Sequence, residues 1–351
     1  MGCTSLRGPV EKTSLVGIAR MAAQSPLVRE RAEVEYFRLE ARSTLNRESS
    51  GRMPFAWTIN PYRGCEFGCH YCYARYTHEF MEMWDSRDFE RKIYAKTGAA
   101  ENLRAELRQG RDKGLPIALG TATDPYQPAE RQFEITCRLL EVFAEFQALD
   151  LSITTKSVLI LRDVELLQSL AARHRFSVHM TVTTHDERLA RLLEPKAPAP
   201  FLRLEAVRKL AQAGIRVGVN AMPFLPGLND APRTLEALAA QAAQAGAQFL
   251  YGNVLFLPPS AVKQFMPFLK REFPHLVNRY RKLYARSAYL RGEYPEKIAR
   301  LLAELRTRYG LDGNRGEVPA AARHPQMALP FEMPPGGEER HLALTACHNP
   351  P

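Results

Sequence analysis

Residues 202–224 read LRLEAVRKLAQAGIRVGVNAMPF, which is a helical pattern followed by a short β-prone run. The apolar residues of its first part recur at the spacing of one helix face, namely Leu204, Val207, Leu210 and Ala211. Gly214 then ends the helical pattern, because glycine readily adopts the left-handed conformation found just beyond a helix. The stretch therefore predicts a helix that packs on a sheet and leads into a strand.

The same rhythm of strand and helix extends from Trp57 to Leu257. The candidate strands are Trp57–Arg63, Pro116–Gly120, Asp150–Lys156, Phe176–Thr184, Arg216–Phe224 and Phe249–Leu257. The helical patterns that follow them are Glu101–Arg108, Cys137–Ala148, Arg162–Arg173, Glu187–Leu193, Leu202–Ala213 and Pro232–Ala245. Such repeats imply parallel strands joined by right-handed crossovers.

This pattern indicates an α/β fold. Six units are too few for a closed eightfold barrel, so a partial (β/α)6 TIM-like barrel and an open doubly wound sheet remain. Of the two, we expect the partial barrel of parallel strands, followed by a C-terminal helical extension. In either fold, functional groups gather beyond the C-terminal ends of the strands.

We expect four segments along the chain. They are an N-terminal extension over 1–50, a core barrel over 51–258, a basic helical extension over 259–312 and a disordered tail over 313–351. The first segment is predicted to contain a short helix over Leu27–Ala41. The third is predicted to form long helices over Ala261–Arg286 and Pro295–Tyr309. The tail is rich in Pro, Gly and Ala, a composition typical of disorder.

The composition is that of an ordinary globular protein, with 45% hydrophobic and 25% charged residues, which is enough apolar material for a full core. No run approaches 18 uninterrupted apolar residues, and the N-terminus lacks a secretory signal, so we expect a cytoplasmic protein without a membrane span. The formal net charge of +10 favours acidic partners such as nucleic acid. A host with generally basic proteins would account for the same charge.

Residues 60–75 read NPYRGCEFGCHYCYAR, and this stretch holds three of the six cysteines. Cys65, Cys69 and Cys72 have the spacing C-x3-C-x2-C, which lets three thiolates surround one metal centre from a single loop. Gly64 and Gly68 would permit the tight turns that such a loop requires. A disulfide framework is typical of short secreted chains with small cores, which this chain is not.

An iron–sulfur cluster normally takes four cysteines, so three would leave one iron with an open coordination position. A structural zinc ion is the alternative, and it would need a fourth ligand such as His70 or His78. Three buried cysteines that are adjacent by chance are a further alternative. We favour the iron–sulfur interpretation, because three of six cysteines within eight residues indicate a common purpose.

The cysteine spacing, with the aromatic Tyr71 before the last cysteine, resembles the signature of the radical S-adenosylmethionine (SAM) superfamily. The similarity covers Trp57 to Leu257 and is greatest to the branch related to spore photoproduct lyase, the DNA repair photolyase-like proteins. The resemblance implies a [4Fe–4S] cluster on the three cysteines and S-adenosylmethionine chelated by the open iron. It also implies reductive cleavage of the C5′–S bond, which gives a 5′-deoxyadenosyl radical that abstracts hydrogen from a substrate.

The resemblance further implies residues that seat the cofactor, namely Tyr71 of the cysteine loop and others at the ends of the second and third strands. Thr123 and Asp124 match the position that contacts the amino group, and Lys156 matches the position that pairs with the carboxylate. The alternative for Asp124 is an Asp-Pro turn with a helix cap. The alternative for Lys156 is a solvated side chain that opens the next loop.

The fourth strand alternates polar and apolar residues, which is typical of a strand with one polar face. His179, Thr181 and Thr183 fall on one face, while Val178, Met180 and Val182 fall on the other. A buried polar row is costly unless it is paired, so a polar ligand is expected there. The resemblance makes Thr181 a ribose contact, although threonine is also an ordinary strand former.

Glu194 and the downstream Arg203 resemble a Glu-Pro and Arg pattern of the same relatives, which implies that Glu194 lies at the cofactor site. A buried ion pair between the two would be purely structural.

Tyr126 follows the second strand, and we consider it a candidate radical relay. The alternative is a turn aromatic that packs on the rim of the barrel. Spore photoproduct lyases carry a cysteine beside this strand, whereas residues 120–123 here read GTAT. The lyase reaction itself is therefore not expected, and the exact radical chemistry, of lyase or oxidoreductase type, stays open.

The C-terminal basic helices could contact phosphates and stack bases, so nucleic acid is the leading substrate class. The alternative is that Phe265, Phe268 and Phe273 belong to the core. Radical modification of a protein, peptide or small molecule is a second possibility, and a non-catalytic zinc-stabilised nucleic-acid-binding module is a third. Reductive chemistry at a cluster implies an external electron donor of flavodoxin or ferredoxin type.

Overall fold

The central element is a sheet with six parallel strands. The computed structural model describes residues 15–31, 33–51 and 53–313. The parallel strands lie side by side in chain order: β4 (Trp57–Ile59), β7 (Ile117–Leu119), β8 (Asp150–Thr155), β9 (Arg175–Thr181), β10 (Val217–Asn220) and β11 (Leu250–Tyr251). β3 (Asn46–Arg47) adds an antiparallel edge on β4. The parallel α/β prediction is confirmed, and the order never reverses as it does in a doubly wound sheet.

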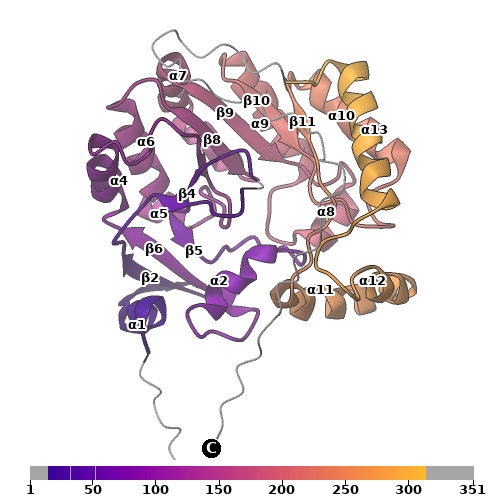
Figure 1. Ribbon diagram of the computed structural model, residues 1–351, viewed down its shortest axis with the longest axis horizontal. Helices are drawn as coiled ribbons and strands as arrows, with labels where there is room; N and C mark the ends of the chain where they lie inside the picture. The colour runs from indigo at the N-terminus through magenta and orange to yellow at the C-terminus, as the bar shows by residue number, and fades with distance from the viewer. Residues whose placement is uncertain (1–14, 32, 52, 314–351) are drawn as a thin grey trace, which may run out of the picture.

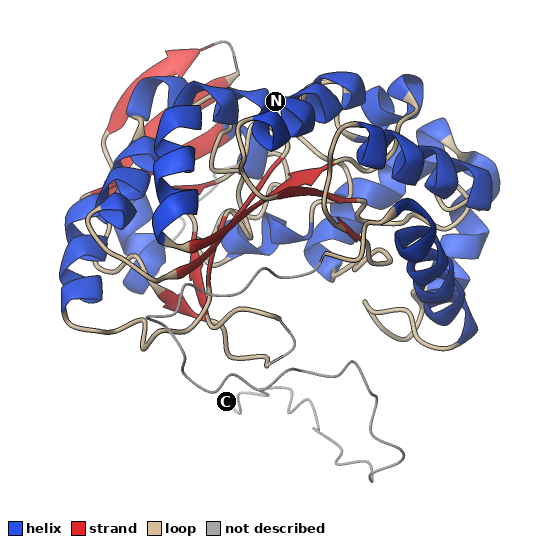
Figure 2. Ribbon diagram, turned by 90° about the horizontal axis from the view of Figure 1, so that it is seen from above, coloured by secondary structure: helices blue, strands red, loops and turns tan. Residues whose placement is uncertain are grey.

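Helices connect these strands, and the strands cross the middle of the molecule between them (Figures 1 and 2). The connecting helices are α4 (Ala99–Arg108), α5 (Glu130–Phe133), α6 (Ile135–Ala144), η2 (Val158–Asp163), α7 (Val164–Arg173), α8 (Glu187–Leu193), α9 (Pro200–Gln212) and α10 (Pro232–Gln244). The six predicted helices are all present. α9 begins two residues earlier than predicted, because proline fits the first position of a helix.

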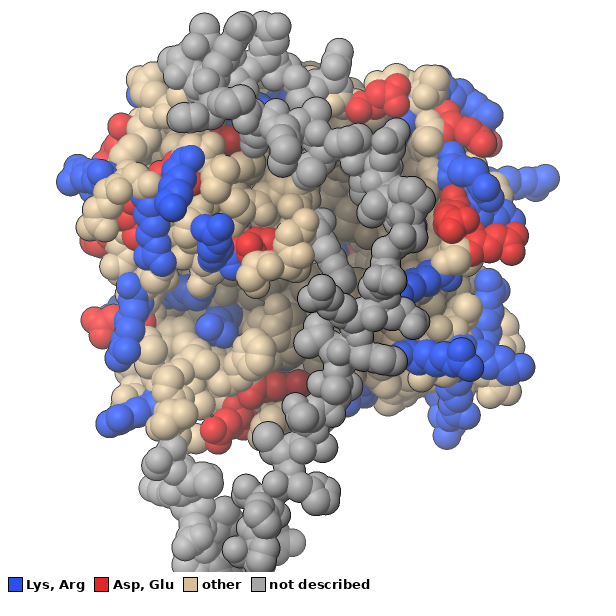
Figure 3. Space-filling model, in the orientation of Figure 1, with Lys and Arg blue, Asp and Glu red and all other residues tan. Residues whose placement is uncertain are grey.

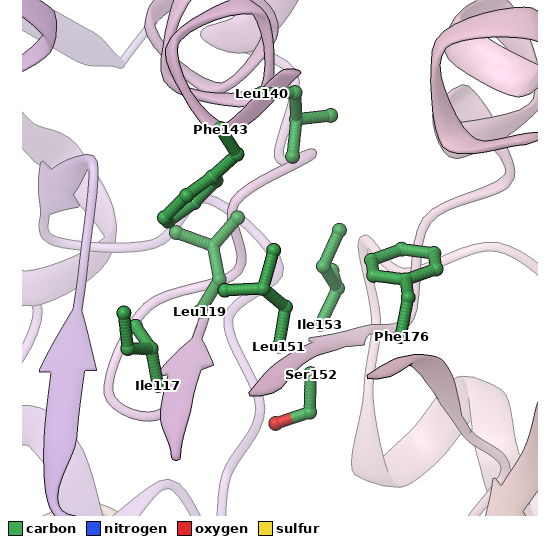
Figure 4. A pocket seen from close by; sticks show the side chains of 8 residues that line it. All are labelled: Ile117, Leu119, Leu140, Phe143, Leu151, Ser152, Ile153 and Phe176. Atoms are coloured by element: carbon green, nitrogen blue, oxygen red, sulfur yellow. The ribbon is translucent and has the colours of Figure 1, made fainter. Parts of the chain in front are cut away.

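One face of the sheet is apolar and packs on the helices. Figure 4 shows side chains of β7 and β8 directed toward Leu140 and Phe143 of α6, whereas Ser152 points the opposite way. In β9, Val178 and Met180 are fully buried, which confirms the alternation predicted for this strand. The small gap in Figure 4 lies within this apolar core, so it is a packing defect and no place for a polar cofactor.

A second sheet replaces the helix predicted over Leu27–Ala41, and that prediction is wrong. Its strand order is β1 (Leu27–Arg31), β2 (Val34–Glu40), β6 (Lys92–Thr97) and β5 (Tyr62–Arg63). The decisive side chains are Val34 and Tyr36, which are buried two residues apart as in a strand. β2 also pairs in parallel with β6, a long-range contact that no local pattern announces.

The predicted first strand, Trp57–Arg63, is in fact two strands in two sheets. β4 belongs to the central sheet, and β5 pairs with β6 of the second sheet. The interruption falls at Asn60-Pro61, where proline lacks the N–H that a continuous ladder needs. The chain therefore changes sheets immediately before the cysteine loop.

The remaining helices lie before β4, in the segment between β5 and β6, and after β11. They are α1 (Gly17–Gln24), η1 (Tyr73–Arg75), α2 (Tyr76–Glu79), α3 (Asp88–Arg91), α11 (Pro259–Glu272), η3 (Pro274–Leu276), α12 (Val277–Leu283) and α13 (Glu293–Tyr309). The helix predicted over Ala261–Arg286 is divided into α11 and α12. The break falls at Phe273, because the helical conformation is disfavoured for a residue that precedes proline, here Pro274. The predicted tail lies outside the described residues, apart from Gly313.

The aromatic side chains of α11 belong to a hydrophobic core. Phe265 and Phe268 are buried against the cysteine loop, in a cluster that also includes Tyr71 and Tyr280. They are therefore unavailable for stacking on bases, and the core alternative holds for these two residues. No helix of the described residues is long and apolar enough to span a membrane.

Phe249 fills the polar face of the sheet at one end. Its ring lies above Gly218 of β10, where an added Cβ would come within 2.2 Å of Phe249 Cδ2. The same ring packs on His179 of β9, with the centroids 4.7 Å apart. Gly218 is therefore required because only a residue without a side chain leaves room for this ring.

We expect Gly218→Ala to lower the free energy of unfolding by about 1–3 kcal/mol, because it overpacks a filled site. Phe249→Leu replaces the ring with a smaller side chain, which leaves room for the alanine methyl group. The double variant should therefore lose less free energy of unfolding than the sum of the losses in the two single variants. Urea denaturation of the parent, the two single variants and the double variant measures this coupling. Strictly additive losses would show that the two side chains do not compete for the same space.

Candidate functional site

The three cysteines lie on the loop between β5 and η1 (Figure 1). Cys65, Cys69 and Cys72 form no disulfide. Gly64 and Gly68 have φ values of +82° and +63°, which confirms the predicted tight turns. At Gly64 an added Cβ would lie 2.7 Å from a backbone oxygen, so this turn requires glycine.

One end of the cysteine loop is fixed by two buried side chains that the sequence did not single out. Gln127 Nε2 donates to the Gly64 carbonyl over 2.9 Å, and its Oε1 accepts from Glu66 N over 3.0 Å. The Glu66 carboxylate accepts from Ala129 N over 2.7 Å and from Tyr36 Oη over 2.9 Å. The loop is therefore tied both to the segment after β7 and to the second sheet.

The other end of the loop is fixed by Arg75, which is almost fully buried. Its Nη2 donates to the Cys69 carbonyl over 3.0 Å and to Glu90 Oε2 over 2.8 Å. Its Nη1 donates to the Ser86 carbonyl. One guanidinium thus orders the backbone between the second and third cysteines.

The three cysteines are half-buried, with cations nearby. Burial raises the pKa of Cys69 to about 12, and Lys156 acts in the opposite direction. Burial also raises the pKa of Cys65 and the pKa of Cys72. At Cys72, the nearby Arg75 acts in the opposite direction. Metal binding requires the thiolate form, so adjacent cations are what a cluster of negatively charged ligands needs.

The donor set fits an iron–sulfur cluster better than zinc. The His70 ring stacks on Phe268 with centroids 4.3 Å apart, and His78 Nε2 lies 3.0 Å from the Lys92 carbonyl. Both histidine rings thus have partners other than the three thiols. Within the described residues, no three His, Cys, Asp or Glu side chains converge on a single metal ion. A cubane instead spreads its cysteine ligands over separate irons.

Glu194 is the centre of a buried polar network beside the loop. Tyr71 Oη donates to Glu194 Oε1, and Thr183 Oγ1 donates to the same oxygen over 2.7 Å. Arg203 Nη2 lies 2.6 Å from Glu194 Oε2, and Lys156 Nζ lies 3.7 Å from Oε1. Burial opposes ionisation of Glu194, but Arg203 and Lys156 outweigh it and lower its pKa to about 2.

Asp124 and Thr123 lie after β7 and bind mainly to neighbouring backbone. Asp124 accepts from Thr155 Oγ1 and Lys156 N, both over 2.7 Å, and from Tyr126 N over 2.9 Å. Thr123 Oγ1 donates to the Tyr62 carbonyl over 3.1 Å. Asp124 therefore joins the C-terminal ends of β7 and β8, and burial raises its pKa. Its predicted contact with a cofactor amino group stays a prediction.

The structure brings most of the predicted site residues together. Tyr71, Lys156 and Glu194 are in mutual contact, and the Lys156 ammonium lies 5.8 Å from the centre of the Tyr71 ring. Thr181 ends β9, where its carbonyl accepts from Arg203 Nη1 over 3.1 Å. Tyr126 differs, because it belongs to the apolar core. Burial and the nearby Asp163 raise its pKa well above the usual value.

Asn229 is a further structural residue that the sequence did not reveal. Its Nδ2 donates to the carbonyls of Thr183 and Pro223, over 2.8 and 3.1 Å, and its Oδ1 accepts from Leu225 N over 2.6 Å. It thereby holds the loop after β10 against the end of β9. Its place in a Pro-Gly-rich loop was visible in the sequence, but its distant partners were not.

A row of five aromatic rings passes through Tyr73, the residue directly after Cys72, and we call it the aromatic row. Its members are Tyr289, Phe256, Tyr73, Tyr76 and Phe80, with successive centroids 4.3, 6.0, 6.5 and 5.4 Å apart. Tyr73, Phe80 and Tyr289 are 39%, 62% and 48% exposed. Tyr73 Oη also donates to the Thr121 carbonyl after β7. The row therefore connects the cysteine loop with the segment after β11.

Lysine and arginine side chains, interspersed with Asp and Glu, lie on both sides of the face seen in Figure 3. Two of the exposed cations, Arg286 and Arg291, flank Tyr289 in the chain. Aromatic and cationic groups are thus combined at one end of the aromatic row.

Solved structures resemble this fold. A spore photoproduct lyase complexed with dinucleoside spore photoproduct superposes with a TM-score of 0.59 at 17% identity, covering 87% of this chain and 85% of that chain. A mutant of a spore photoproduct lyase, also with the dinucleoside, gives a TM-score of 0.55 at 14% identity, covering 77% and 78%. At these identities the similarity concerns the fold.

Curated relatives are similar over most of their length. An uncharacterized protein of Mycobacterium tuberculosis is 34% identical over 313 residues, which cover 89% of this chain and 92% of the relative. An uncharacterized protein of Methanocaldococcus jannaschii is 28% identical over 69% of this chain and 85% of its own. The family model of the radical SAM superfamily matches residues 59–239, which include the cysteine loop and β5 to β10. The chain therefore belongs to the radical SAM superfamily, whose members are enzymes that use radical chemistry.

Proposed function

We propose that Cys65, Cys69 and Cys72 hold a [4Fe–4S] cluster that binds S-adenosylmethionine at its open iron. The observation that carries this proposal is the arrangement of three half-buried thiols on one loop, which Gln127 ties to the segment after β7 and Tyr71 brings against Lys156 after β8. When bound, these two cofactors supply reductive cleavage of the sulfonium to a 5′-deoxyadenosyl radical. The protein binds, orients and shields them.

The residues around Cys69 are suited to orient an amino acid group. The Lys156 ammonium lies between Glu194 and the Tyr71 ring, and Arg203 also pairs with Glu194. Two cations thus share one carboxylate, which leaves Lys156 able to pair with a second carboxylate from the cofactor. Thr123 and Asp124 would receive the amino group, and Thr181 would contact the ribose. Glu194 would act by fixing Tyr71 and Lys156 in place. The radical-relay role of Tyr126 stays a prediction, without support from its core position.

The strand order supports the partial (β/α)6 barrel. Right-handed crossovers place the helices of a singly wound sheet on one face, so the other face curves around an interior. That interior carries His179, from the polar row predicted for the fourth strand, and also Ser152 and Asn220 from the neighbouring strands. We propose the same core over 51–258, extended by the pairing of β2 with β6.

For the substrate we propose nucleic acid with at least one unstacked base. The support is the exposed aromatic row beside Cys72, together with the cations Arg286 and Arg291. Aromatic rings offer stacking to any base, and guanidinium groups offer contacts to phosphate. A structurally similar protein carries a dinucleoside, which supports the same substrate class.

The first prediction concerns the cluster. Cys69→Ala, reconstituted without oxygen, should lose the charge-transfer absorbance near ~400 nm and release no 5′-deoxyadenosine above background. Cys137→Ala is the matched control, because Cys137 is half-buried on α6 and should leave both signals intact. Iron, sulfide and zinc analysis complete the measurement. A Cys69→Ala protein with full iron and sulfide, or a parent chain that holds zinc without iron, would contradict the proposal.

The second prediction concerns cofactor binding. Lys156→Gln should weaken binding of S-adenosylmethionine by about 10–100-fold, because a charged hydrogen bond contributes about 1.5–3 kcal/mol. Equilibrium dialysis of the reconstituted protein measures the affinity, and iron content shows that the cluster is retained. Lys209→Gln, an exposed lysine on α9, is the control. An unchanged affinity in the Lys156 variant would rule out the carboxylate contact.

The third prediction concerns the aromatic row. Phe80→Ala and Tyr289→Ala should each weaken binding of a single-stranded oligonucleotide, since stacking contributes about 1–3 kcal/mol per base. Fluorescence anisotropy at two salt concentrations measures the affinity. Phe201→Ala, which removes a 55% exposed ring from α9, should have no effect. Failure of the parent chain to bind any oligonucleotide at low salt would remove nucleic acid as the substrate.

A further inference from the structure

A second cationic feature lies at the other end of the cysteine loop, and we call it the basic pocket. It has a volume of about 140 Å³ between β1 and the segment around α5, and its cationic walls are Arg29, Arg31 and Arg131. All three side chains are exposed, and Arg29 Nη1 donates to Gln132 Oε1 over 2.6 Å. In the part of the chain that the structure describes, none of the three forms an ion pair with a carboxylate. Three unneutralised guanidinium groups in one small pocket favour an acidic partner.

The floor of the basic pocket contacts the cysteine loop directly. Tyr36 and Ala129 line the pocket, and both donate hydrogen bonds to the Glu66 carboxylate, over 2.9 and 2.7 Å. Glu66 is buried and follows Cys65 in the chain. The wall of the pocket is therefore linked by hydrogen bonds to Glu66, whose backbone is joined directly to that of Cys65, a proposed cluster ligand.

A fourth cationic residue contacts the cysteine loop. Lys196 is exposed, and its backbone N–H donates to the Phe67 carbonyl of this loop over 3.3 Å. Phe67 follows Glu66 in the chain, so Lys196 adds a further positive charge next to the segment that contacts the basic pocket.

The basic pocket is not equipped to stack a base. Its aromatic residue, Tyr36, is 4% exposed, and its hydroxyl is committed to Glu66. The exposed rings of the aromatic row instead lie at the other end of the loop, after Cys72. Substrate and pocket ligand therefore approach the loop at its two ends, Tyr73 and Glu66.

We propose that the basic pocket docks an acidic one-electron carrier protein, which rests on the proposed cluster at Cys65, Cys69 and Cys72. The carrier would place carboxylates on the three arginines, with its redox centre toward Glu66 and Cys65. It loses one electron and the cluster gains one, while no covalent bond forms or breaks. Opposite charge on the two surfaces accelerates their encounter and selects their orientation.

The test uses the full chain, reconstituted, and a flavodoxin as the acidic carrier. The charge-reversal variant R29E/R31E/R131E is compared with K209E/R233E/R300E, which changes the charge equally at exposed positions of α9, α10 and α13. R29Q/R31Q/R131Q removes the charge without reversing it, and guards against misfolding of the first variant. Two quantities are measured: the affinity for oxidised flavodoxin, and the rate of cluster reduction by reduced flavodoxin or by dithionite.

We expect R29E/R31E/R131E to weaken flavodoxin binding and to slow reduction by flavodoxin at low salt, each by at least about 10-fold, with a smaller loss for the glutamine variant. Dithionite is a small reductant, so its rate should be the same in all variants. High salt should shrink the difference, because screening weakens exposed charges. The control variant should behave as the parent.

Equal flavodoxin affinity in the parent and R29E/R31E/R131E would overturn the docking proposal. So would a loss of oligonucleotide binding in this variant with flavodoxin binding unchanged, since the pocket would then serve nucleic acid. If dithionite yields no reduced cluster even in the parent chain, the proposed function fails, and the docking proposal fails with it.

Discussion

The buried carboxylate of Glu194 holds the site together. It joins Tyr71 of the cysteine loop, Lys156 after β8, Thr183 after β9 and Arg203 of α9. Removing one charged partner from such a pair leaves an uncompensated buried charge, which costs about 3–5 kcal/mol. Tyr71 precedes Cys72, so the contacts of Glu194 that stabilise the fold also fix the position of the third cysteine. A substitution that disturbs these contacts is therefore expected to affect both the stability of the fold and the position of Cys72.

The repeating part of the fold could be predicted from the sequence because its signals are local. Helix faces such as Leu204 to Ala211, and the alternation along β9, depend on neighbours within a few residues. The second sheet could not be predicted in this way. β2 finds its partner in β6, more than 50 residues later, and the exposed β1 carries charges that obscure its period. The break after Ile59 has a local signal in Asn60-Pro61, but nothing local shows that the two halves join different sheets.

The site was predictable to the extent that its residues are adjacent in the chain. The three cysteines stand within eight residues, and Lys156 and Asp124 follow predicted strands, so their grouping follows from parallel topology. Gln127, Glu66 and Asn229 act through partners on other elements, and a single sequence contains no sign of those pairings. Tyr126 shows the converse, because its proximity to a strand end did not reveal that its ring turns into the core.

The hydrogen bond from Tyr36 to Glu66 has a consequence for the length of chain that the enzyme needs. A shortened protein that starts at residue 51 would retain Cys65, Cys69 and Cys72 and every βα unit of the central sheet. It would nevertheless lose β2, expose one edge of β6 and leave Glu66 with one donor fewer. The minimal folding unit therefore begins before β2, well upstream of the first residue that the radical SAM family model matches.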